Sequence, residues 1–554
     1  MNENLRTWVR SGKPWIWLNA GMASAAIIMV VGLLLYIAAR GMSHFWPDRV
    51  VRFDYVEADG NVSRVLGEVV ETETLSAARL KAIGMTPPPG ETRVQRVLIK
   101  TANRDLTGAD FQWFVRHDVR NEEYPENVLE LEREEWGNFI GFPVALKENG
   151  TVVESGSTLE SELAVRLLRR ADIREQIRDI EKDRIGAVNY RLEQIRRQER
   201  KAEAGGSLDA AARAAFDRER ETLDEQYAAL TGQLGKLYED IKRDSLLMKT
   251  VDGTEVDIPF EKIVRAFEPN AMGPFDRLAF FFDKFWEFVA DDPREANTEG
   301  GIYPAIFGTV LMVIIMAVMV TPFGVIAAVY LSEYAKQGPF TRMIRIAVNN
   351  LAGVPSVVYG VFGLGFFVYF LGGRIDELFY AEALPAPTFG TPGLLWSSLT
   401  LALLTVPVVI VATEEGLSRI PKSIREGSLA LGATKAETLW RTVLPMATPG
   451  MMTGVILAIA RAAGEVAPLM LVGVVKLAPS LPLDGNAPFL HLDRKFMHLG
   501  FHIYDVGFQS PNVEAARPLV YATAFLLVLV IVVLNLTAIR IRNRLREKYN
   551  AAES

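Results

Sequence analysis

The sequence predicts an all-α polytopic membrane protein with six transmembrane helices and an inserted extracytoplasmic α+β domain that contains an antiparallel coiled-coil hairpin. Two observations predict this fold class: long apolar runs and an uneven distribution of charge. The 554 residues are 49% hydrophobic and 23% charged, with a net charge of -7. Residues 41–300 hold 37 Lys and Arg against 51 Asp and Glu, whereas the rest of the chain holds 23 against 16. An acidic, water-soluble block is therefore inserted into a basic membrane protein.

The composition excludes several classes of function. The chain has no cysteine, so it has no disulfide, thiolate metal site or cysteine nucleophile. Its acidic balance argues against a nucleic-acid-binding protein, which is normally basic. The sequence contains no G-x-x-x-x-G-K-[ST] phosphate-binding loop, so this chain is not the ATP-hydrolysing part of a transporter. We expect no enzymatic activity, no metal site and no cofactor bound by this chain.

Six apolar runs are long enough to cross a membrane. A bilayer core needs about 20 mostly apolar helical residues, because exposed backbone cannot be hydrated there. The first run exceeds the apolar region of about 7–15 residues found in a signal peptide, so we expect a retained helix. The predicted spans are residues 16–39, 304–331, 346–371, 394–413, 451–475 and 519–539.

The positions of Lys and Arg orient these helices, since both concentrate in short cytoplasmic loops. All four basic clusters fall on one side of a six-span topology. They are Arg6, Arg10 and Lys13; Lys336, Arg342 and Arg345; Arg419, Lys422, Arg425, Lys435 and Arg441; and Arg540, Arg542, Arg544, Arg546 and Lys548. We therefore expect both termini in the cytoplasm of a bacterium, and residues 41–300 in the periplasm.

The inserted block changes its sequence period along its length. Alternating apolar and polar residues predict strands in two β-rich parts, about residues 50–158 and 247–268. Between them, at about 159–246, apolar residues at 4-3 spacing predict a coiled-coil hairpin. Its seam is Ile173, Ile177, Ile180, Ile185, Val188, Leu192 and Ile195 in one arm, and Leu223, Tyr227, Leu230, Leu234, Leu237 and Ile241 in the other. We interpret its charges as a solvated surface, with a binding face as the alternative.

Residues 275–289 form an amphipathic, aromatic-rich segment just before the second span. Such a helix suits a membrane interface. Packing onto the β-rich part is an equally good interpretation of the same pattern.

The loop between the fourth and fifth spans predicts two short helices. Pro421 suits a first helical turn, and Gly432 suits the left-handed residue that ends a helix. Thr434 and Glu437 have the spacing of a capping box, which starts a second helix that we expect to stop near Pro445. Four apolar residues are candidate anchors for a groove on another protein: Leu429, Leu431, Leu439 and Trp440. The alternative is a pair of amphipathic helices lying on their own bundle.

This loop resembles the coupling loop of ABC importer permeases, which reads Glu-Ala-Ala, three residues, Gly, nine residues, Ile-x-Leu-Pro. Glu426, Gly432, Leu444 and Pro445 match, whereas Gly427 and Ser428 replace the alanines and Thr442 replaces the isoleucine. Further segments resemble the PstA-type permeases of phosphate ABC importers between residue 297 and about 540. They are Asn297-Thr-Glu-Gly-Gly301, Thr321-Pro-Phe-Gly324, Tyr330-Leu-Ser-Glu-Tyr334, Val354-Pro-Ser356 and Ala458-Ile-Ala-Arg-Ala-Ala-Gly-Glu-Val-Ala-Pro468.

The resemblance implies a permease subunit for inorganic phosphate in the bacterial inner membrane. It divides the chain into a first helix (1–40), a periplasmic insertion (41–300), a permease core (301–540) and a basic tail (541–554). It implies four partners besides membrane lipid: a homologous permease, two copies of a cytoplasmic ATPase that uses ATP and Mg, and a periplasmic phosphate-binding protein. The ATPase would act on residues 414–449, through Glu426, Gly427, Ser428, Leu429, Gly432, Leu444 and Pro445.

Arg461 and Glu465 are the only charges in the predicted fifth span. Each costs about 2.5–3.5 kcal/mol at a helix centre, so neither is expected to face lipid. An Arg fork matches two oxyanion oxygens, and Glu465 would neutralise Arg461 while the path is empty. The resemblance implies the same role, since both residues fall on charged positions implicated in phosphate passage. The alternative is an ion pair that only fixes helix packing.

Two other functions stay open. In the first, the chain is a permease whose cargo is another oxyanion such as phosphonate, because an Arg recognises any of these anions. Alternatively, the chain is a membrane-anchored periplasmic scaffold or sensor whose functional part is the insertion, since residues 41–300 have no role in the resemblance.

Overall fold

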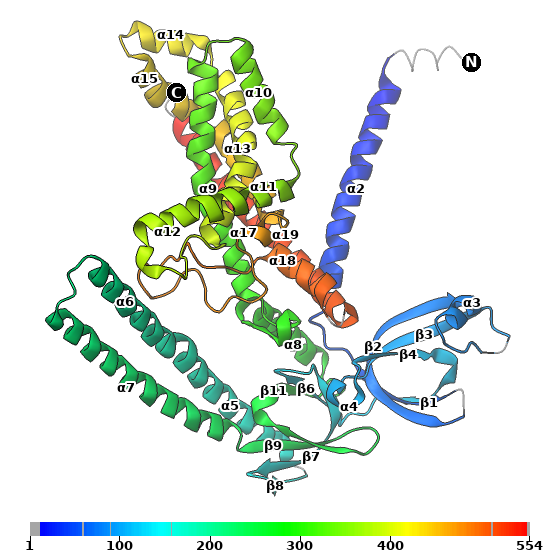
Figure 1. The fold of residues 1–554 in the computed structure, drawn as a ribbon. Helices are drawn as coiled ribbons and strands as arrows, with labels where there is room; N and C mark the ends of the chain where they lie inside the picture. Colours follow the sequence, from blue (N-terminus) through cyan, green and yellow to red (C-terminus); the bar gives the residue numbers. More distant parts are fainter. Residues whose placement is uncertain (1–10, 58–59, 89, 157, 511–512, 551–554) are drawn as a thin grey trace, which may run out of the picture.

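The computed structural model describes residues 11–57, 60–88, 90–156, 158–510 and 513–550 (Figure 1). Arg6 and Arg10, two of the charges expected before the first span, lie outside these residues. A bundle of long helices and a β-rich insertion lie at opposite ends of the molecule. Helices α14 and α15 and the C-terminus lie at the end of the bundle farthest from the sheets (Figure 1).

The prediction of six transmembrane helices is confirmed. Among the described residues, six helices are long and apolar enough to cross a membrane: Trp15–Ser43, Tyr303–Tyr334, Ser356–Phe379, Leu394–Ser418, Lys435–Gly464 and Ala516–Glu547. The helices of this part are α2 (Lys13–Ser43), α9 (Tyr303–Val329), α10 (Pro339–Leu351), α11 (Ser356–Phe362), α12 (Gly373–Phe379), α13 (Leu394–Ser418), α14 (Lys422–Ala430), α15 (Lys435–Thr438), α16 (Leu444–Gly464), α17 (Leu469–Val472), α18 (Leu499–Tyr504) and α19 (Val513–Asn550).

The predicted third span begins at the wrong residue. Residues 339–351 form a separate amphipathic helix, α10, and the span itself starts at Ser356. Pro355 has no N–H to donate and disfavours helical backbone in the residue before it. Its own backbone is extended, with ψ 136°, and this residue separates α10 from α11. The span then continues from α11 through a π-helical segment, Gly363–Gly372, into α12.

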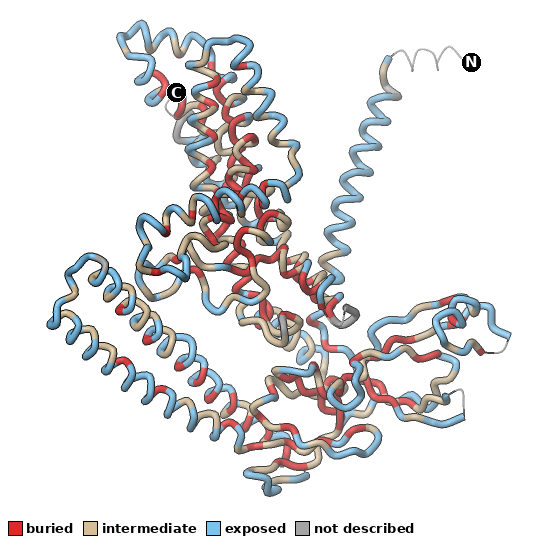
Figure 2. The backbone as a smooth tube through the Cα atoms, viewed as in Figure 1, coloured by how far each residue is buried: buried red, intermediate tan, exposed pale blue. Residues whose placement is uncertain are grey.

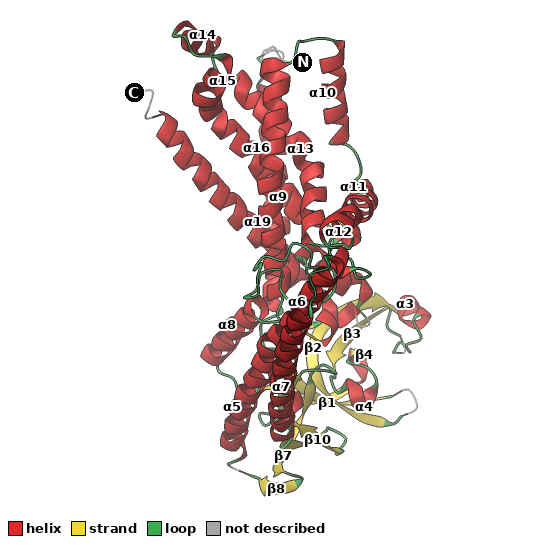
Figure 3. Ribbon diagram, turned by 60° about the vertical axis from the view of Figure 1, so that its left-hand side comes forward, coloured by secondary structure: helices red, strands yellow, loops and turns green. Residues whose placement is uncertain are grey.

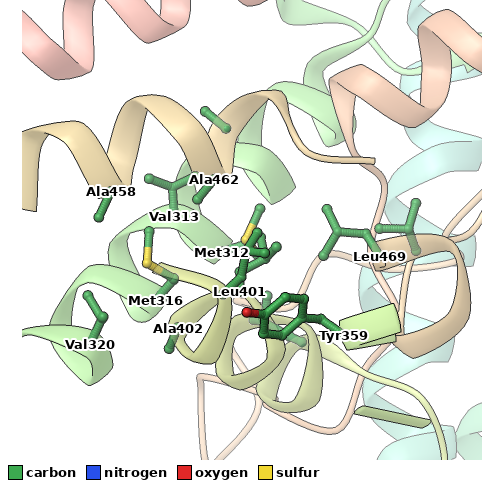
Figure 4. Close-up of a cluster of buried hydrophobic side chains, with 14 of the residues drawn as sticks. Met312, Val313, Met316, Val320, Tyr359, Leu401, Ala402, Ala458, Ala462 and Leu469 are labelled. Atoms are coloured by element: carbon green, nitrogen blue, oxygen red, sulfur yellow. The ribbon is translucent and has the colours of Figure 1, made fainter. Parts of the chain in front are cut away.

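The core of the bundle lies where α9, α13 and α16 meet (Figure 4). Met312 and Met316 of α9, Leu401 of α13 and Ala458 of α16 are fully buried in it. The close packing depends on glycines, as in many membrane helix pairs. A Cβ atom on Gly450 would lie 2.6 Å from the Cα of Gly416, so α13 and α16 touch there through their backbones.

Most of helix α2 is exposed (Figure 2). It meets the rest of the chain near its C-terminal end, where a Cβ atom on Gly41 would lie 2.8 Å from the Tyr521 carbonyl oxygen of α19. Phe45, two residues beyond α2, is buried with Leu519 and Leu526.

The insertion contains the strands that its alternating pattern predicts, arranged in two large antiparallel sheets and a small third sheet of β12 and β13. The first has the order β4-β3-β2-β1-β5, and the second has β10-β9-β7-β6-β11 with β8 on β7. The strands are β1 (Val50–Val56), β2 (Val62–Ser76), β3 (Arg93–Lys100), β4 (Phe111–Val115), β5 (Val119–Glu123), β6 (Leu129–Arg133), β7 (Phe139–Glu148), β8 (Thr151–Glu154), β9 (Asp244–Lys249), β10 (Glu255–Pro259), β11 (Ile263–Phe267), β12 (Pro293–Arg294) and β13 (Glu299–Gly300). Short helices α3 (Ala77–Ala82) and α4 (Arg104–Thr107) connect strands of these sheets.

The helical part of the insertion forms two antiparallel arms (Figures 1 and 3). One arm is α5 (Leu159–Arg178), a π-helical segment (Asp179–Arg184) and α6 (Ile185–Ala204); the other is α7 (Ala210–Ile241). Ile180 and Ile185 are five residues apart, which breaks the 4-3 spacing of the seam. This break falls on the π-helical segment, whose extra residue shifts the helical register. Tyr227, predicted in the seam, is 42% exposed. Coiled-coil interdigitation along the arms stays a prediction.

The α6 arm reaches the loops of the bundle. The Arg200 guanidinium donates to the carbonyl oxygens of Glu382 and Leu384, both at 3.1 Å. The Tyr190 ring stands edge-on to His491, with ring centroids 6.2 Å apart. The insertion therefore contacts the loop before α13 and the long loop before α18.

Candidate functional site

Arg461 and Glu465 are brought together, but not within one helix. Helix α16 ends at Gly464, and Glu465 is already extended, with ψ 132°. Pro468 explains the end, because it has no N–H to donate to the Gly464 carbonyl. The prediction that residues 451–475 form one span is therefore wrong beyond residue 464. Even so, Arg461 Nε lies 3.6 Å from Glu465 Oε1.

The pair lies at the edge of the apolar core. Ala458, Ala462 and Leu469, its neighbours in sequence, are fully buried (Figure 4). The Arg461 side chain is 33% exposed and that of Glu465 is 21% exposed. Opposite charges attract more strongly beside an apolar surface than in water. One side of the pair is open in the single chain, which leaves Arg461 accessible to an anion or to a partner.

The backbone around Glu465 is held by a close contact with α11. A Cβ atom on Gly360 would lie 2.7 Å from Pro468 Cα and 3.0 Å from the Pro468 carbonyl oxygen. No side chain larger than hydrogen fits there without moving one of the two segments. Gly360 therefore fixes the distance between α11 and the segment that follows Glu465.

A buried polar cluster near α18 has no counterpart in the predicted site. The Asn297 side chain, 2% exposed, donates to the Lys476 carbonyl oxygen at 2.7 Å. Lys476 Nζ lies 3.1 Å from Asp505 Oδ2, and His502 Nδ1 lies 3.4 Å from the Thr523 hydroxyl. These residues are too far apart in sequence to form a motif, although Asn297 opens one segment of the family resemblance.

The loop between α13 and α16 has the two predicted short helices. Gly432 ends the first in the left-handed conformation, with φ +88°. The capping box is confirmed: the Thr434 N–H donates to Glu437 Oε2 at 2.9 Å, and the Glu437 N–H donates to the Thr434 hydroxyl at 3.3 Å. The predicted stop near Pro445 is wrong, because a π-helical segment, Leu439–Val443, leads directly into α16. Pro445 lies in the first turn of α16, where its missing N–H costs little.

The apolar anchors of this loop divide into two groups. Leu431 is 91% exposed, Trp440 is 72% exposed and Leu429 is 46% exposed. Leu439, predicted as an anchor, is instead 3% exposed and packs on Leu417. It belongs to a buried cluster with Leu417 of α13, Val443 of the same π-helical segment and Ala447 of α16. Of the matched motif residues, Glu426, Gly427 and Gly432 are exposed, Ser428 and Pro445 are half-buried, and Leu444 is buried.

Glu333 fastens this loop to the end of α9, and the sequence analysis did not single it out. Its carboxylate Oε1 accepts from Arg425 Nη2 at 2.9 Å, and its backbone carbonyl accepts from the Lys435 ammonium. Lys435 also lies 4.6 Å from the centroid of the Tyr334 ring. Glu333 lies in the segment Tyr330–Tyr334. A charged residue at the end of an apolar span was the feature of the sequence that could have indicated its role.

A single hydrogen bond joins the two short helices. The hydroxyl groups of Ser428 and Thr438 lie 2.9 Å apart. Ser428 occupies an alanine position of the coupling-loop motif, and the structure gives this departure a role in packing α14 on α15.

The bundle and its fastened loop define a multi-pass membrane protein, and comparison with known proteins identifies its family. Residues 303–549 match the model of the binding-protein-dependent transport system inner membrane component family. The chain belongs to this family of inner-membrane permease subunits of ABC transporters.

Several relatives share 30–40% identity with this chain. It is 40% identical over 194 residues to the phosphate transport system permease protein PstA of Mycobacterium leprae, which covers 35% of this chain and 58% of that protein. It is 36% identical over 247 residues to phosphate transport system permease protein PstA 1 of Mycobacterium tuberculosis, covering 44% of this chain and 70% of that one. A probable PstA of Methanocaldococcus jannaschii is 31% identical over 223 residues, with 40% and 67% covered.

Solved structures of ABC transporters are also similar to part of the chain. A chain of the MetNI methionine transporter aligns with a TM-score of 0.32 and 18% identity, covering 44% of this chain and 94% of that one. A chain of a transporter involved in alginate import aligns with a TM-score of 0.33 and 13% identity, covering 48% and 83%.

Proposed function

We propose that the chain is the permease subunit of an ATP-driven importer that moves inorganic phosphate across the bacterial inner membrane. The observation that carries the proposal is the identity of 36–40% to permeases named for phosphate transport. The sequence contains no G-x-x-x-x-G-K-[ST] loop, which supports a separate ATPase. The position of Arg461 at an open helix end supports an anionic cargo.

In this proposal Arg461 is the anion ligand of the pathway and Glu465 is its counter-ion. A guanidinium presents paired N–H donors that match two phosphate oxygens. The existing pair is loose, at 3.6 Å, so an entering anion competes with the Glu465 carboxylate for the Arg461 donors. Release of the anion restores the Arg461–Glu465 pair, which prevents tight trapping.

In this proposal the loop from α13 to α16 receives the conformational change that a partner ATPase undergoes on binding ATP. We propose that exposed Leu431 and Trp440 enter a groove on a separate ATPase, which binds ATP and Mg. Glu426, Gly427, Ser428, Leu429, Gly432, Leu444 and Pro445 shape this surface or support it from beneath. Movement of the ATPase would then pass to α16, because the loop is continuous with that helix.

The proposed assembly contains a homologous permease, two ATPase copies and a periplasmic phosphate-binding protein. Both termini lie in the cytoplasm, and the insertion (41–300) lies in the periplasm between the first helix (1–40) and the permease core (301–540). The basic tail (541–554) continues α19 into the cytoplasm.

The test is uptake of labelled phosphate by cells or vesicles that contain the full complex. Arg461→Gln and Glu465→Gln should each abolish uptake while membrane abundance stays unchanged. Arg374→Gln is the matched control, because this Arg is 65% exposed and pairs with Glu377 of the same helix, outside the coupling loop. Normal uptake by both pathway variants would contradict the assigned roles. Competition by unlabelled phosphonate and other oxyanions defines the cargo.

A further inference from the structure

Helix α8 (Pro274–Ala290) has two apolar faces, of which the fold uses only one. Phe281, Phe285 and Phe288 pack around Phe45, with ring centroids 6.2, 5.5 and 5.2 Å from it. The sequence left two interpretations of this helix, a position at the membrane interface or packing onto the β-rich part. The packing around Phe45 places α8 beside the membrane helices as well as the β-rich part.

The other face of α8 is an exposed aromatic stripe. Phe275 is 86% exposed, Leu278 44%, Phe282 60% and Trp286 69%. These positions recur at three- and four-residue spacing, so they share one side of the helix. The four side chains form a continuous apolar stripe along nearly the whole of α8.

The position of α8 is set by the ends of two membrane helices. The Ile302 N–H, one residue before α9, donates to the Phe288 carbonyl at 2.8 Å. Phe45 lies six residues beyond the apolar run of α2, which corresponds to about 9 Å along a helix. The interfacial layer on each side of a bilayer core is about 5–8 Å thick. Helix α8 is therefore at the outer edge of this layer, on the side that holds the insertion (Figure 1).

The polar flanks of α8 are paired toward the insertion. Lys284 Nζ lies 2.8 Å from Glu132 of β6, and Arg265 of β11 lies 2.8 Å from Asp283 and 3.0 Å from Glu287. These pairs fix the rotation of α8 about its axis. The aromatic stripe is consequently held outward, with the charges turned to the sheet.

We propose that the stripe Phe275–Leu278–Phe282–Trp286 lies in the headgroup–acyl boundary of the membrane and anchors the insertion to the lipid surface. Phe, Leu and Trp on one face of a helix at this depth are the residues that enter this boundary. The neighbouring helix α2, which ends two residues before Phe45, also has no buried residues in its most apolar window. The occupant is lipid, and the anchor fixes the base of the helical arms relative to the bilayer.

The experiment uses the absence of cysteine from the chain. Phe275→Cys, Phe282→Cys and Trp286→Cys are made singly in the full chain, spin-labelled, and reconstituted into phosphatidylcholine–phosphatidylglycerol vesicles. Collision rates with oxygen, which partitions into lipid, and with a water-soluble nickel chelate are then measured. Val318→Cys, at a 69% exposed site of α9, is the lipid control, and Glu225→Cys, exposed on α7, is the water control.

The proposal expects the stripe labels to resemble Val318→Cys, with an oxygen-to-nickel ratio several-fold above that of Glu225→Cys. A ratio equal to the water control at two or more of the three sites would overturn it. Immobile labels shielded from both reagents would overturn it as well, because a protein partner would then cover the stripe. Each variant that folds gives its own answer, so the loss of one leaves the test intact.

Discussion

Arg425 of α14 and Glu333 at the end of α9 meet at 2.9 Å across 92 positions of the chain. Their side chains are only 21% and 13% exposed. Arg425 also donates to the carbonyl oxygens of Ile420 and Leu417, at 2.9 and 2.8 Å. The proposed coupling loop is thus tied to the second span by a charged contact beneath its surface.

Removing one partner of this contact should lower thermal stability and phosphate uptake more than removing both partners. Glu333→Gln leaves the Arg425 charge partly buried and unpaired, whereas Glu333→Gln with Arg425→Gln removes that cost. We expect a coupling free energy of about 0.5–3 kcal/mol in a double-mutant cycle on thermal stability, and uptake reduced several-fold in the single variants. The exposed Arg419–Glu415 pair provides the control cycle, with coupling near zero. Additive effects of Glu333 and Arg425 would refute the link.

Leu431 and Leu439 should respond oppositely to truncation. Leu439→Ala opens a cavity at a 3% exposed site and should cost about 2–5 kcal/mol of stability. Leu431→Ala should leave the melting temperature unchanged and lower phosphate uptake, because its side chain is 91% exposed and is proposed to enter the ATPase. Thermal unfolding and uptake of both variants check this. Full uptake by Leu431→Ala would remove it from the proposed contact.

Gly360→Ala should impair transport by displacing the segment after Glu465. The added methyl would meet Pro468 Cα at 2.7 Å, and overpacking of this kind typically costs about 1–3 kcal/mol. Gly365→Ala is the matched control, since its added Cβ would have no neighbour within 4 Å. Uptake and thermal stability are measured for both. Equal uptake by the two variants would mean that this close contact is unimportant for the pathway.

The stability of the insertion should fall as the pH rises from about 4.5 to about 8. Burial and the charge of Glu68 raise the pKa of Glu130 from 4.5 to about 8, against the opposing effect of Lys100. The protonated form is therefore favoured by folding, and its contribution is full below pH 4.5 and is lost as the pH rises through 8.

Glu130→Gln mimics the protonated side chain, so it should flatten the fall in melting temperature between pH 4.5 and 8, the window between the ordinary and the raised pKa of Glu130. The Asn138 amide, now bound to the Glu130 carboxylate, keeps an oxygen acceptor in this variant. Glu126→Gln, at an exposed site, should keep the original slope. A Glu130→Gln protein with the original pH dependence would show that another group titrates.

Shortening the helical arms should distinguish a transporter from a scaffold. A deletion of 159–247 would remove part of β9, which lies inside the second sheet. Deletion of 186–233 with a short glycine-rich turn keeps the base, because Tyr238 and Glu181 face each other there, with Oη and Oε1 2.7 Å apart. We expect phosphate uptake to survive largely intact. Loss of uptake with normal abundance would assign the arms an essential role.

Local chemistry predicted the parts of the fold that depend on neighbours in sequence. The spans follow from apolar length, and the capping box follows from Thr434 and Glu437. The division of the chain into an insertion and a permease core stays a prediction.

The errors have two causes, single prolines and tertiary contacts. Apolar content could not separate α10 from the third span or show that α16 ends before Glu465, because single prolines decide both. Burial of Leu439 and the pairing of Glu333 with Arg425 depend on how α9, α13 and α14 pack, which no local pattern encodes. Arg461 and Glu465 were found because two charges in an apolar run are conspicuous.

Arg200 holds the loop before α13 through backbone oxygens alone. Every residue offers the same carbonyl group, so exchange of the Glu382 or Leu384 side chain leaves these acceptors in place. A change in the path of the loop, by contrast, withdraws both acceptors together. The contact at the far end of the α6 arm therefore depends on the path of the loop backbone and not on the loop side chains. Substitutions in the loop can accumulate without removing these two hydrogen bonds.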